Sequence, residues 1–179
     1  TAEQDHGVEP WRLVLRSGQR HVVDLDDGRL EGIGPFGVEV RTLDGRPVAA
    51  SVLQRFGEVG GLSVRPAVAV AARGWVVDLG ERYGAMTDVL AVMNPAIEGI
   101  ATIEVKVLAG TAPANVVRSV ELSPGTQVSF DLGAGPPVVL AVESTAPVIA
   151  SVHARAESSA TGSIAVAVAG TEARPVPSR

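Results

Sequence analysis

Residues 88–108 constrain the fold of this chain more than any other segment. They hold an apolar run, an Asn-Pro pair and a run in which apolar and polar residues alternate. Alternation with a period of two is typical of a β-strand that buries one face and exposes the other. The segment is therefore predicted to be a β-hairpin or β-arch. The side chains expected to point one way are Ile103, Val105 and Val107, and those expected to point the other way are Thr102, Glu104 and Lys106.

The composition extends this prediction to the rest of the chain. Hydrophobic residues make up 46% of the 179 residues, which is enough for a core, and Val and Ala dominate among them. Twenty glycines and twelve prolines interrupt the chain at short intervals. Because no stretch of about 12 residues free of both shows helical periodicity, we predict an all-β fold.

Charge and cysteine content narrow the expected partners and chemistries. The net charge is −5, and the fourteen arginines and the single lysine are scattered. Nucleic acids and anionic lipid surfaces bind clustered cations, so neither is an expected partner. The lack of cysteine excludes disulfides, thiol nucleophiles and thiolate metal sites. No apolar run approaches the roughly 20 residues of a membrane span. We interpret the chain, which starts at Thr1, as a mature region whose signal or anchor lies outside it.

The last third of the chain repeats part of the first third. Three pairs of segments match, and within each pair the residue numbers differ by a constant offset. In one pair six of nine residues are identical at an offset of 100, a second pair has the same offset, and the third has an offset of 107. The change of offset places seven additional residues in the loop 26–37 of the first copy. Three matches in one order indicate a duplication. The matched pairs are residues 15–25 with 122–132, 47–55 with 147–155, and 63–69 with 163–169.

The duplication divides the chain into an incomplete repeat at residues 1–72, a complete repeat at residues 73–170 and a polar tail at residues 171–179. Eight short strands in one repeat fit an immunoglobulin-like β-sandwich, so the predicted architecture is tandem modules of that type. The predicted strands of the complete repeat are residues 75–79, 86–93, 100–108, 115–122, 127–132, 138–143, 147–156 and 162–169.

The incomplete repeat has no segment that corresponds to residues 75–108. A sandwich without its first three strands exposes apolar faces and sheet edges. Three interpretations stay open: the missing strands lie upstream in the natural protein, a second chain supplies them by strand exchange, or the first repeat is a smaller sheet packed on the second. Its predicted strands are residues 11–15, 19–25, 38–43, 47–56 and 61–70, with turns at Arg16-Ser17-Gly18 and Asp44-Gly45.

Four motifs of the complete repeat carry a family resemblance. They are Trp75-Val-Val-Asp, Asn94-Pro95 after an apolar strand, Ser123-Pro124-Gly125, and Ala146-Pro147-Val148 before the last matched strand. Together they resemble a family of large secreted or membrane-anchored actinobacterial proteins that are built from tandem β-sandwich modules and classed as a domain of unknown function. The resemblance extends over residues 11–170. It implies an extracytoplasmic location and a cell-envelope role, and it supplies no catalytic residues.

Two loop motifs carry candidate ligand chemistry. Residues 32–37 satisfy G-x-G-x-x-G, but a dinucleotide site needs a following helix, and here a strand is predicted to follow. We therefore expect no dinucleotide there. Residues 24–31 contain four carboxylates, which Ca²⁺ prefers as ligands, but they lack EF-hand spacing. We interpret them as a polar loop, with a calcium site as the alternative. The carboxylates are those of Asp24, Asp26, Asp27 and Glu31.

The histidines and serines form no catalytic constellation in the sequence. His6, His21 and His153 lie far apart, and the last two occupy positions at which the other copy has an aliphatic residue. We interpret them as packed or half-exposed side chains. Ser51 and Ser151 recur as part of a strand, and no nucleophile elbow, H-E-x-x-H or Walker sequence occurs.

Arginine and tryptophan side chains are the remaining candidates. Arg55 and Arg155 recur at the end of a matched strand, where an arginine either binds a carboxylate or phosphate or covers the end of the sandwich. We favour the covering role. Trp75 is interpreted as a core residue, with a ligand platform as the alternative.

We expect no enzyme, no cofactor and no catalytic, cofactor-binding or metal-ligating residue. The predicted function is a non-enzymatic scaffold or protein-interaction module outside the cytoplasm, at the bacterial cell envelope. The expected partner surfaces are residues 26–36 and the exposed strands of the first repeat, which also allow self-association. The alternative is a polysaccharide-binding module that accompanies an envelope enzyme and uses exposed Trp11 or Trp75.

Overall fold

The computed structural model describes residues 11–25, 38–56, 61–67, 70–80, 86–112, 116–156, 168–169 and 174–175. Every regular element in these ranges is a β-strand, and every strand pair is antiparallel, which confirms the all-β prediction. The strands are β1 (Ser51–Phe56), β2 (Gly61–Pro66), β3 (Val70–Leu79), β4 (Met86–Met93), β5 (Ala101–Gly110), β6 (Ser119–Leu122), β7 (Gln127–Asp131), β8 (Val138–Ala156), β9 (Val168–Ala169) and β10 (Arg174–Pro175).

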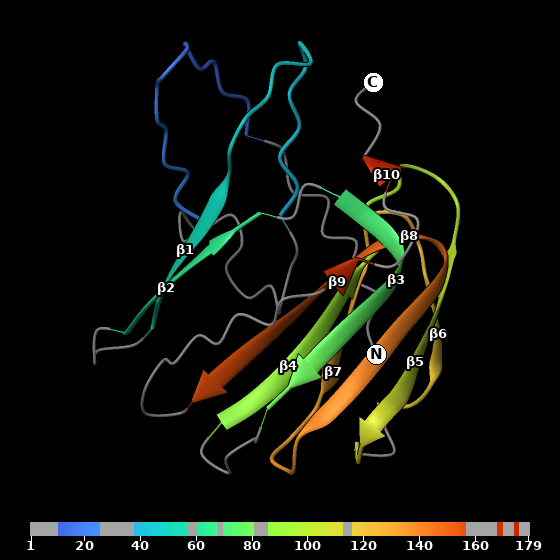
Figure 1. Ribbon diagram of the computed structural model, residues 1–179. Helices are drawn as coiled ribbons and strands as arrows, with labels where there is room; N and C mark the ends of the chain where they lie inside the picture. Colours follow the sequence, from blue (N-terminus) through green and yellow to red (C-terminus); the bar gives the residue numbers. More distant parts are fainter. Residues whose placement is uncertain are drawn as a thin grey trace.

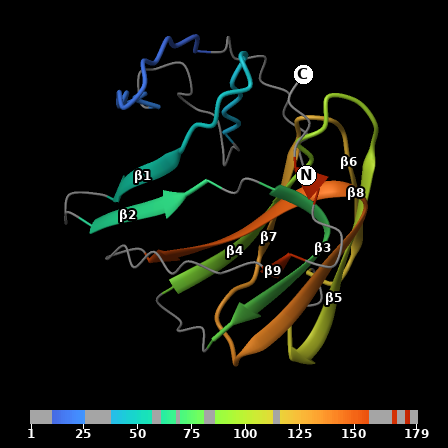
Figure 2. The same cartoon turned by 45° about the horizontal axis from the view of Figure 1, so that its top comes forward.

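The long strand β8 joins the two halves of one eight-stranded hydrogen-bonded sheet, and we name these halves the two sheets. Its first part pairs with β3 on one edge and with β5 on the other, and β5 pairs in turn with β6. Its second part pairs with β4, which pairs in turn with β7. Figures 1 and 2 show β8 running beside β5, bending over and returning beside β4. The two sheets face each other as in a β-sandwich, and the shared strand closes one side as in a barrel.

β8 bends where its pairing with β3 is interrupted. Ala72 pairs with Val148 and Gly74 pairs with Glu143, so β8 has additional residues opposite this part of β3. Additional residues in one strand of an antiparallel pair bend that strand. Pro147 lies among them and has no N–H to donate to a ladder. The predicted gap between separate strands at residues 138–143 and 147–156 is therefore wrong, because the chain stays one strand and changes sheets there.

The core lies between the two sheets and takes side chains from β3 to β8. β3 shows the alternation clearly, because Trp75, Val77 and Leu79 are buried and Val76 and Asp78 are exposed. Fully buried side chains of other strands, and of Leu132 directly after β7, complete the core. Among the largest are Leu90, Ile103, Leu132, Leu140, Val92, Val105 and Val142.

The alternation predicted for β5 is confirmed. Ile103 and Val105 have 0% exposure, whereas Glu104 is exposed and Lys106 is half-buried. The pattern fades toward the end of the strand, where Val107 is only partly buried. The predicted inward-facing residues are therefore fully buried only in the first half of β5, which lies beside β6 and β8.

Gly110 ends β5 at a position that no other residue fits. Its φ is +80°, and a Cβ built there would lie 2.2 Å from the carbonyl oxygen of Pro137. We expect Gly110→Ala to lower the free energy of unfolding by about 3 kcal/mol, from the left-handed backbone and the clash together. Gly125→Ala is the control, because Gly125 has a φ of +73° but open space around it. It should cost about 1 kcal/mol in the same urea titration. Equal costs would contradict the clash.

The first repeat forms its predicted turns but few of its predicted strands. Gly18 and Gly45 have φ of +73° and +72°, as turn glycines should. Residues 11–25 and 38–50 nevertheless contain no strand, so the strands predicted at 11–15, 19–25 and 38–43 are wrong. Within the described part of residues 1–72, the strands that pair with each other are β1 and β2, and they lie with residues 11–25 and 38–50 to one side of the two sheets (Figures 1 and 2). Turn chemistry is local, whereas a strand needs a partner.

Corresponding residues of the two copies lie in unlike environments. Val48 is 44% exposed and Val148 0%, and Val52 is 43% exposed and Val152 3%. Unlike packing at matched positions counts against the prediction of two copies of one folded module, so the match between residues 47–55 and 147–155 is supported by the sequence alone.

Two short strands near the end of the chain pair with β3. β9 pairs with Trp75 and Val76, and β10 pairs with Val70 and Ala71. β10 falls within residues 171–179, so part of the predicted polar tail belongs to a sheet. Among the described residues, no helix has the length and hydropathy of a membrane span.

Candidate interaction surface

Trp75 is a core residue, as predicted. Its side chain is 4% exposed, and its indole Nε1 donates hydrogen bonds to the carbonyl oxygens of Ala72 at 3.2 Å and Val148 at 2.9 Å. The bond to Ala72 stays within β3, and the bond to Val148 ties β3 to the bend of β8. Phe130 is also buried, at 2% exposure. Neither ring is available to a ligand outside the core.

The other candidate residues are distributed as follows. His21 and Asp24 are exposed side chains of residues 11–25. His6 and the loop 26–37, with its glycine motif and its acidic residues, lie outside the described residues. For three more residues the backbone is described but the side chain is not, namely Arg55 in β1 and His153 and Arg155 in β8. Within the described part of the chain, no three His, Cys, Asp or Glu side chains are grouped to hold a metal ion.

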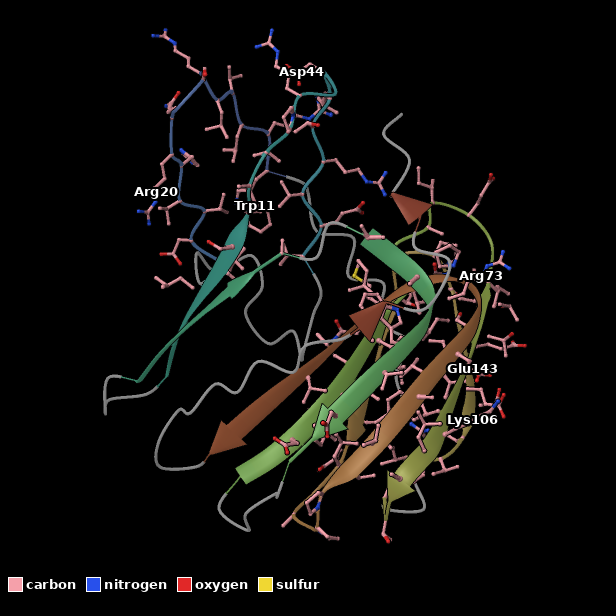
Figure 3. All side chains as sticks on the ribbon, viewed as in Figure 1. Trp11, Arg20, Asp44, Arg73, Lys106 and Glu143 are labelled. Atoms are coloured by element: carbon pink, nitrogen blue, oxygen red, sulfur yellow. The ribbon has the colours of Figure 1, made fainter. Side chains whose placement is uncertain are left out.

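One charge cluster lies on the outer face of β5 and β8. The Nζ of Lys106 lies 2.7 Å from Glu143 Oε2 and 3.1 Å from Glu104 Oε2, and Figure 3 shows Lys106 beside Glu143. The hydrogen bond to Glu143, and then that to Glu104, raises the pKa of Lys106 above its ordinary 10.5. These charges lie in water, so the cluster is a pair of surface salt bridges.

The raised pKa of Lys106 predicts a pH dependence at high pH. A group whose pKa is raised by folding stabilises the folded state fully below its unfolded pKa, and that contribution is lost as pH rises through its folded pKa. We expect the difference in unfolding free energy between the wild type and Lys106→Met to be constant from pH 7 to about 10 and to shrink above about 10.5. Urea titrations at each pH measure it. A difference that stayed constant to pH 12 would contradict this assignment.

Exposed apolar side chains gather on the first repeat. We name the exposed side chains of residues 11–25 and 38–53 the N-terminal apolar surface. Figure 3 shows the side chains of these residues around Trp11, Arg20 and Asp44, to one side of the two sheets. The large hydrophobic residues of this surface are Leu13 (46% exposed), Val14 (93%), Leu15 (40%), Val22 (67%), Val38 (47%), Val40 (56%), Leu43 (89%), Val48 (44%), Val52 (43%) and Leu53 (51%).

Two arginines of this surface pair with near neighbours. Arg41 Nη2 lies 2.9 Å from Glu39 Oε2, and this hydrogen bond raises the pKa of Arg41 above its ordinary value. Arg46 lies 3.4 Å from Asp44. Because these two arginines are paired, covering them with a partner costs less than burying lone charges would.

The surface continues into a sheet edge at β1. β1 pairs with β2 over six residues, from Ser51 with Pro66 to Phe56 with Gly61. Among the described strands, neither β1 nor β2 has a partner on its other edge. An edge with unpaired N–H and C=O groups is a template for another strand. Edge pairing by the first repeat was expected from the sequence, but which strand keeps an open edge depends on the pairing seen here.

Comparison of the chain with protein-family models, with curated proteins and with solved structures finds no match. Its surfaces are therefore interpreted from their own chemistry.

Proposed function

We propose that this protein is a non-enzymatic interaction module whose first repeat binds a protein partner. The observation that carries the proposal is the contrast between the copies. Leu15 and Val52 are 40% and 43% exposed, whereas the corresponding Leu122 and Val152 are each 3% exposed. The second copy covers these positions with its own strands. Large hydrophobic side chains that stay exposed over residues 13–53 are typical of a protein-interaction site.

The free energy gained by burying the exposed apolar side chains favours a bound partner. Burying one exposed Leu or Val side chain contributes about 1.5–3 kcal/mol. Covering even a few of the half-exposed side chains would therefore offset part of the entropy lost on association. A partner could cover these side chains with an extended strand, and an extended strand can also pair with the open edge of β1.

We further propose that the partner is met outside the cytoplasm, at the bacterial cell envelope. The support is the motif resemblance to secreted and membrane-anchored tandem sandwich proteins. The same resemblance supports an immunoglobulin-like type for residues 73–170 and an incomplete module of that type at residues 1–72. A scaffold or spacer role fits this arrangement.

An affinity pull-down from bacterial envelope extract tests the proposal. The bait is the full chain, and its variant carries Val14→Ser, Val22→Ser and Leu43→Ser, which replace the most exposed apolar side chains of the surface. We expect a partner that the wild type retains and the variant loses. The control carries Ile97→Ser and Ile100→Ser, which are 63% and 59% exposed on the second repeat, and should retain the partner. Equal recovery by all three proteins would contradict the proposal.

Polysaccharide binding has less support. Sugar platforms need exposed aromatic rings, and Trp75 and Phe130 lie in the core. Of the aromatic side chains that the structure describes, this leaves Trp11, which is half-buried.

A further inference from the structure

The second repeat contains a template for what the open edge of β1 binds. Residues 147–155 match residues 47–55, and their strand β8 pairs with β4 in a defined register. The opposed residues are Ser151 with Ala91, Val152 with Leu90 and His153 with Val89. At an offset of 100, the corresponding residues of β1 are Ser51, Val52 and Leu53.

Among the described residues, no strand lies beside Val52 in the place that β4 takes beside Val152. Leu90 has 0% exposure and lies directly opposite Val152, which is 3% exposed. Directly opposed side chains in an antiparallel pair lie about 4.5–5.5 Å apart at Cβ and pack against each other. Val52 is 43% exposed, in agreement with an edge that has no such strand.

We propose that the open edge of β1 binds an extended protein segment with the pattern of β4, added as an antiparallel strand. The inference rests on the proposed function, and it names the chemistry of the partner. The segment carries a large aliphatic residue opposite Val52 and a second one two residues later, as Leu90 and Val92 do opposite Val152 and Ala150. Backbone hydrogen bonds supply affinity, and alternate side chains supply register.

A second copy of this chain is not the expected donor through its own β4. That strand pairs on both edges, with β7 and with β8, and its Leu90 and Val92 are fully buried. Releasing it would open the core of the donor. The expected donor is therefore a segment of this type that lies free on another protein or on another repeat.

A fluorescent peptide with the sequence of residues 86–95 is the probe. Anisotropy titration with the full 179-residue chain should give saturable binding of one peptide per chain. A peptide with Leu90→Asp and Val92→Asp should bind at least about tenfold more weakly. The chain variant Val52→Asp should weaken binding by a similar factor, and it should fold because Val52 is 43% exposed.

A matched control tests whether a charge at any exposed apolar position weakens binding. Ile97 lies outside the N-terminal apolar surface and is 63% exposed. Ile97→Asp should leave the peptide affinity unchanged. Equal losses in the Val52→Asp and Ile97→Asp variants would overturn the proposal, and so would a complete lack of binding.

The register is testable with single cysteines, because the natural chain has none. The expected pairs are Ser51→Cys with a peptide carrying Ala91→Cys, and Leu53→Cys with a peptide carrying Val89→Cys. These pairs should form disulfides faster than the two exchanged combinations, whose Cβ atoms lie about 7–8 Å apart. Equal rates in all four combinations would overturn the register.

The outcomes also separate this inference from the function on which it rests. If the peptide does not bind while recovery of a partner in the envelope pull-down still depends on the N-terminal apolar surface, the module binds its partner without strand addition. If the chain forms a dimer that Val52→Asp dissociates and the peptide does not displace, the occupant is a second copy. Either result overturns the proposed strand acceptor for a β4-like segment and leaves the function standing.

Discussion

Val105→Asp is expected to lower the free energy of unfolding by about 5 kcal/mol. Val105 has 0% exposure and lies opposite Val142, which is also fully buried. An unpaired charge in such a site costs about 3–5 kcal/mol, and the lost apolar burial adds to it. Because a typical domain has only about 5–15 kcal/mol of stability, much of the variant should be unfolded at 37 °C. Urea titration followed by the fluorescence of buried Trp75 measures the change.

The neighbouring position supplies the control for Val105→Asp. Lys106 points to the opposite face of β5 and pairs with Glu104 and Glu143. The sequence alone predicts that Lys106→Glu is nearly silent. The structure adds that a third carboxylate would meet two others, so we expect a small loss of stability that salt reduces. Similar losses for the two substitutions would show that the faces of β5 are wrongly assigned.

Asn94→Asp is expected to lower the free energy of unfolding by about 4 kcal/mol. Asn94 has 0% exposure, and its Nδ2 donates to the carbonyl oxygens of Gly99 and Leu122, each at 3.1 Å. Aspartate would place an acceptor oxygen against two acceptors. Each lost bond leaves a buried polar group without a partner, at about 1–3 kcal/mol. Thermal unfolding followed by circular dichroism gives the comparison with the wild type.

The hydrogen bond of Thr126 provides the control for Asn94→Asp. Its Oγ1 donates to the carbonyl oxygen of Ser123 at 2.8 Å, within the turn that Asn94 braces. Thr126→Val removes that single local bond and should cost about 1 kcal/mol. A cost for Asn94→Asp no greater than that of Thr126→Val would mean that the two long-range bonds of Asn94 contribute little.

Asn94 makes one hydrogen bond that the local sequence predicts and one that it does not. An Asn-Pro pair favours a strand end at which the Asn side chain bonds nearby backbone. Asn94 does so, because its Oδ1 accepts a hydrogen bond from the N–H of Ala96 at 3.1 Å. The bond to the carbonyl oxygen of Leu122 spans 28 residues. No local pattern signals such a bond, because it depends on how β6 comes to lie beside β5.

The candidate surface was predictable only in part. The sequence indicated that the first copy lacks the strands that cover the second, and that its exposed strands are candidate partner surfaces. It assigned strands to residues 11–15, 19–25 and 38–43, where the structure has none. Those segments carry strand-forming residues, but without a neighbouring strand the backbone has no ladder to join.

The sequence by itself determined the local features of this protein. It specified the turns at Gly18, Gly45 and Gly125, each with a positive φ, and the inward face of β5, because both follow from residues within a few positions of one another. Only the tertiary structure decided which strand faces are covered. Val52 and Val152 share their local sequence, yet only Val152 has Leu90 opposite it, and burial is a property of such distant partners.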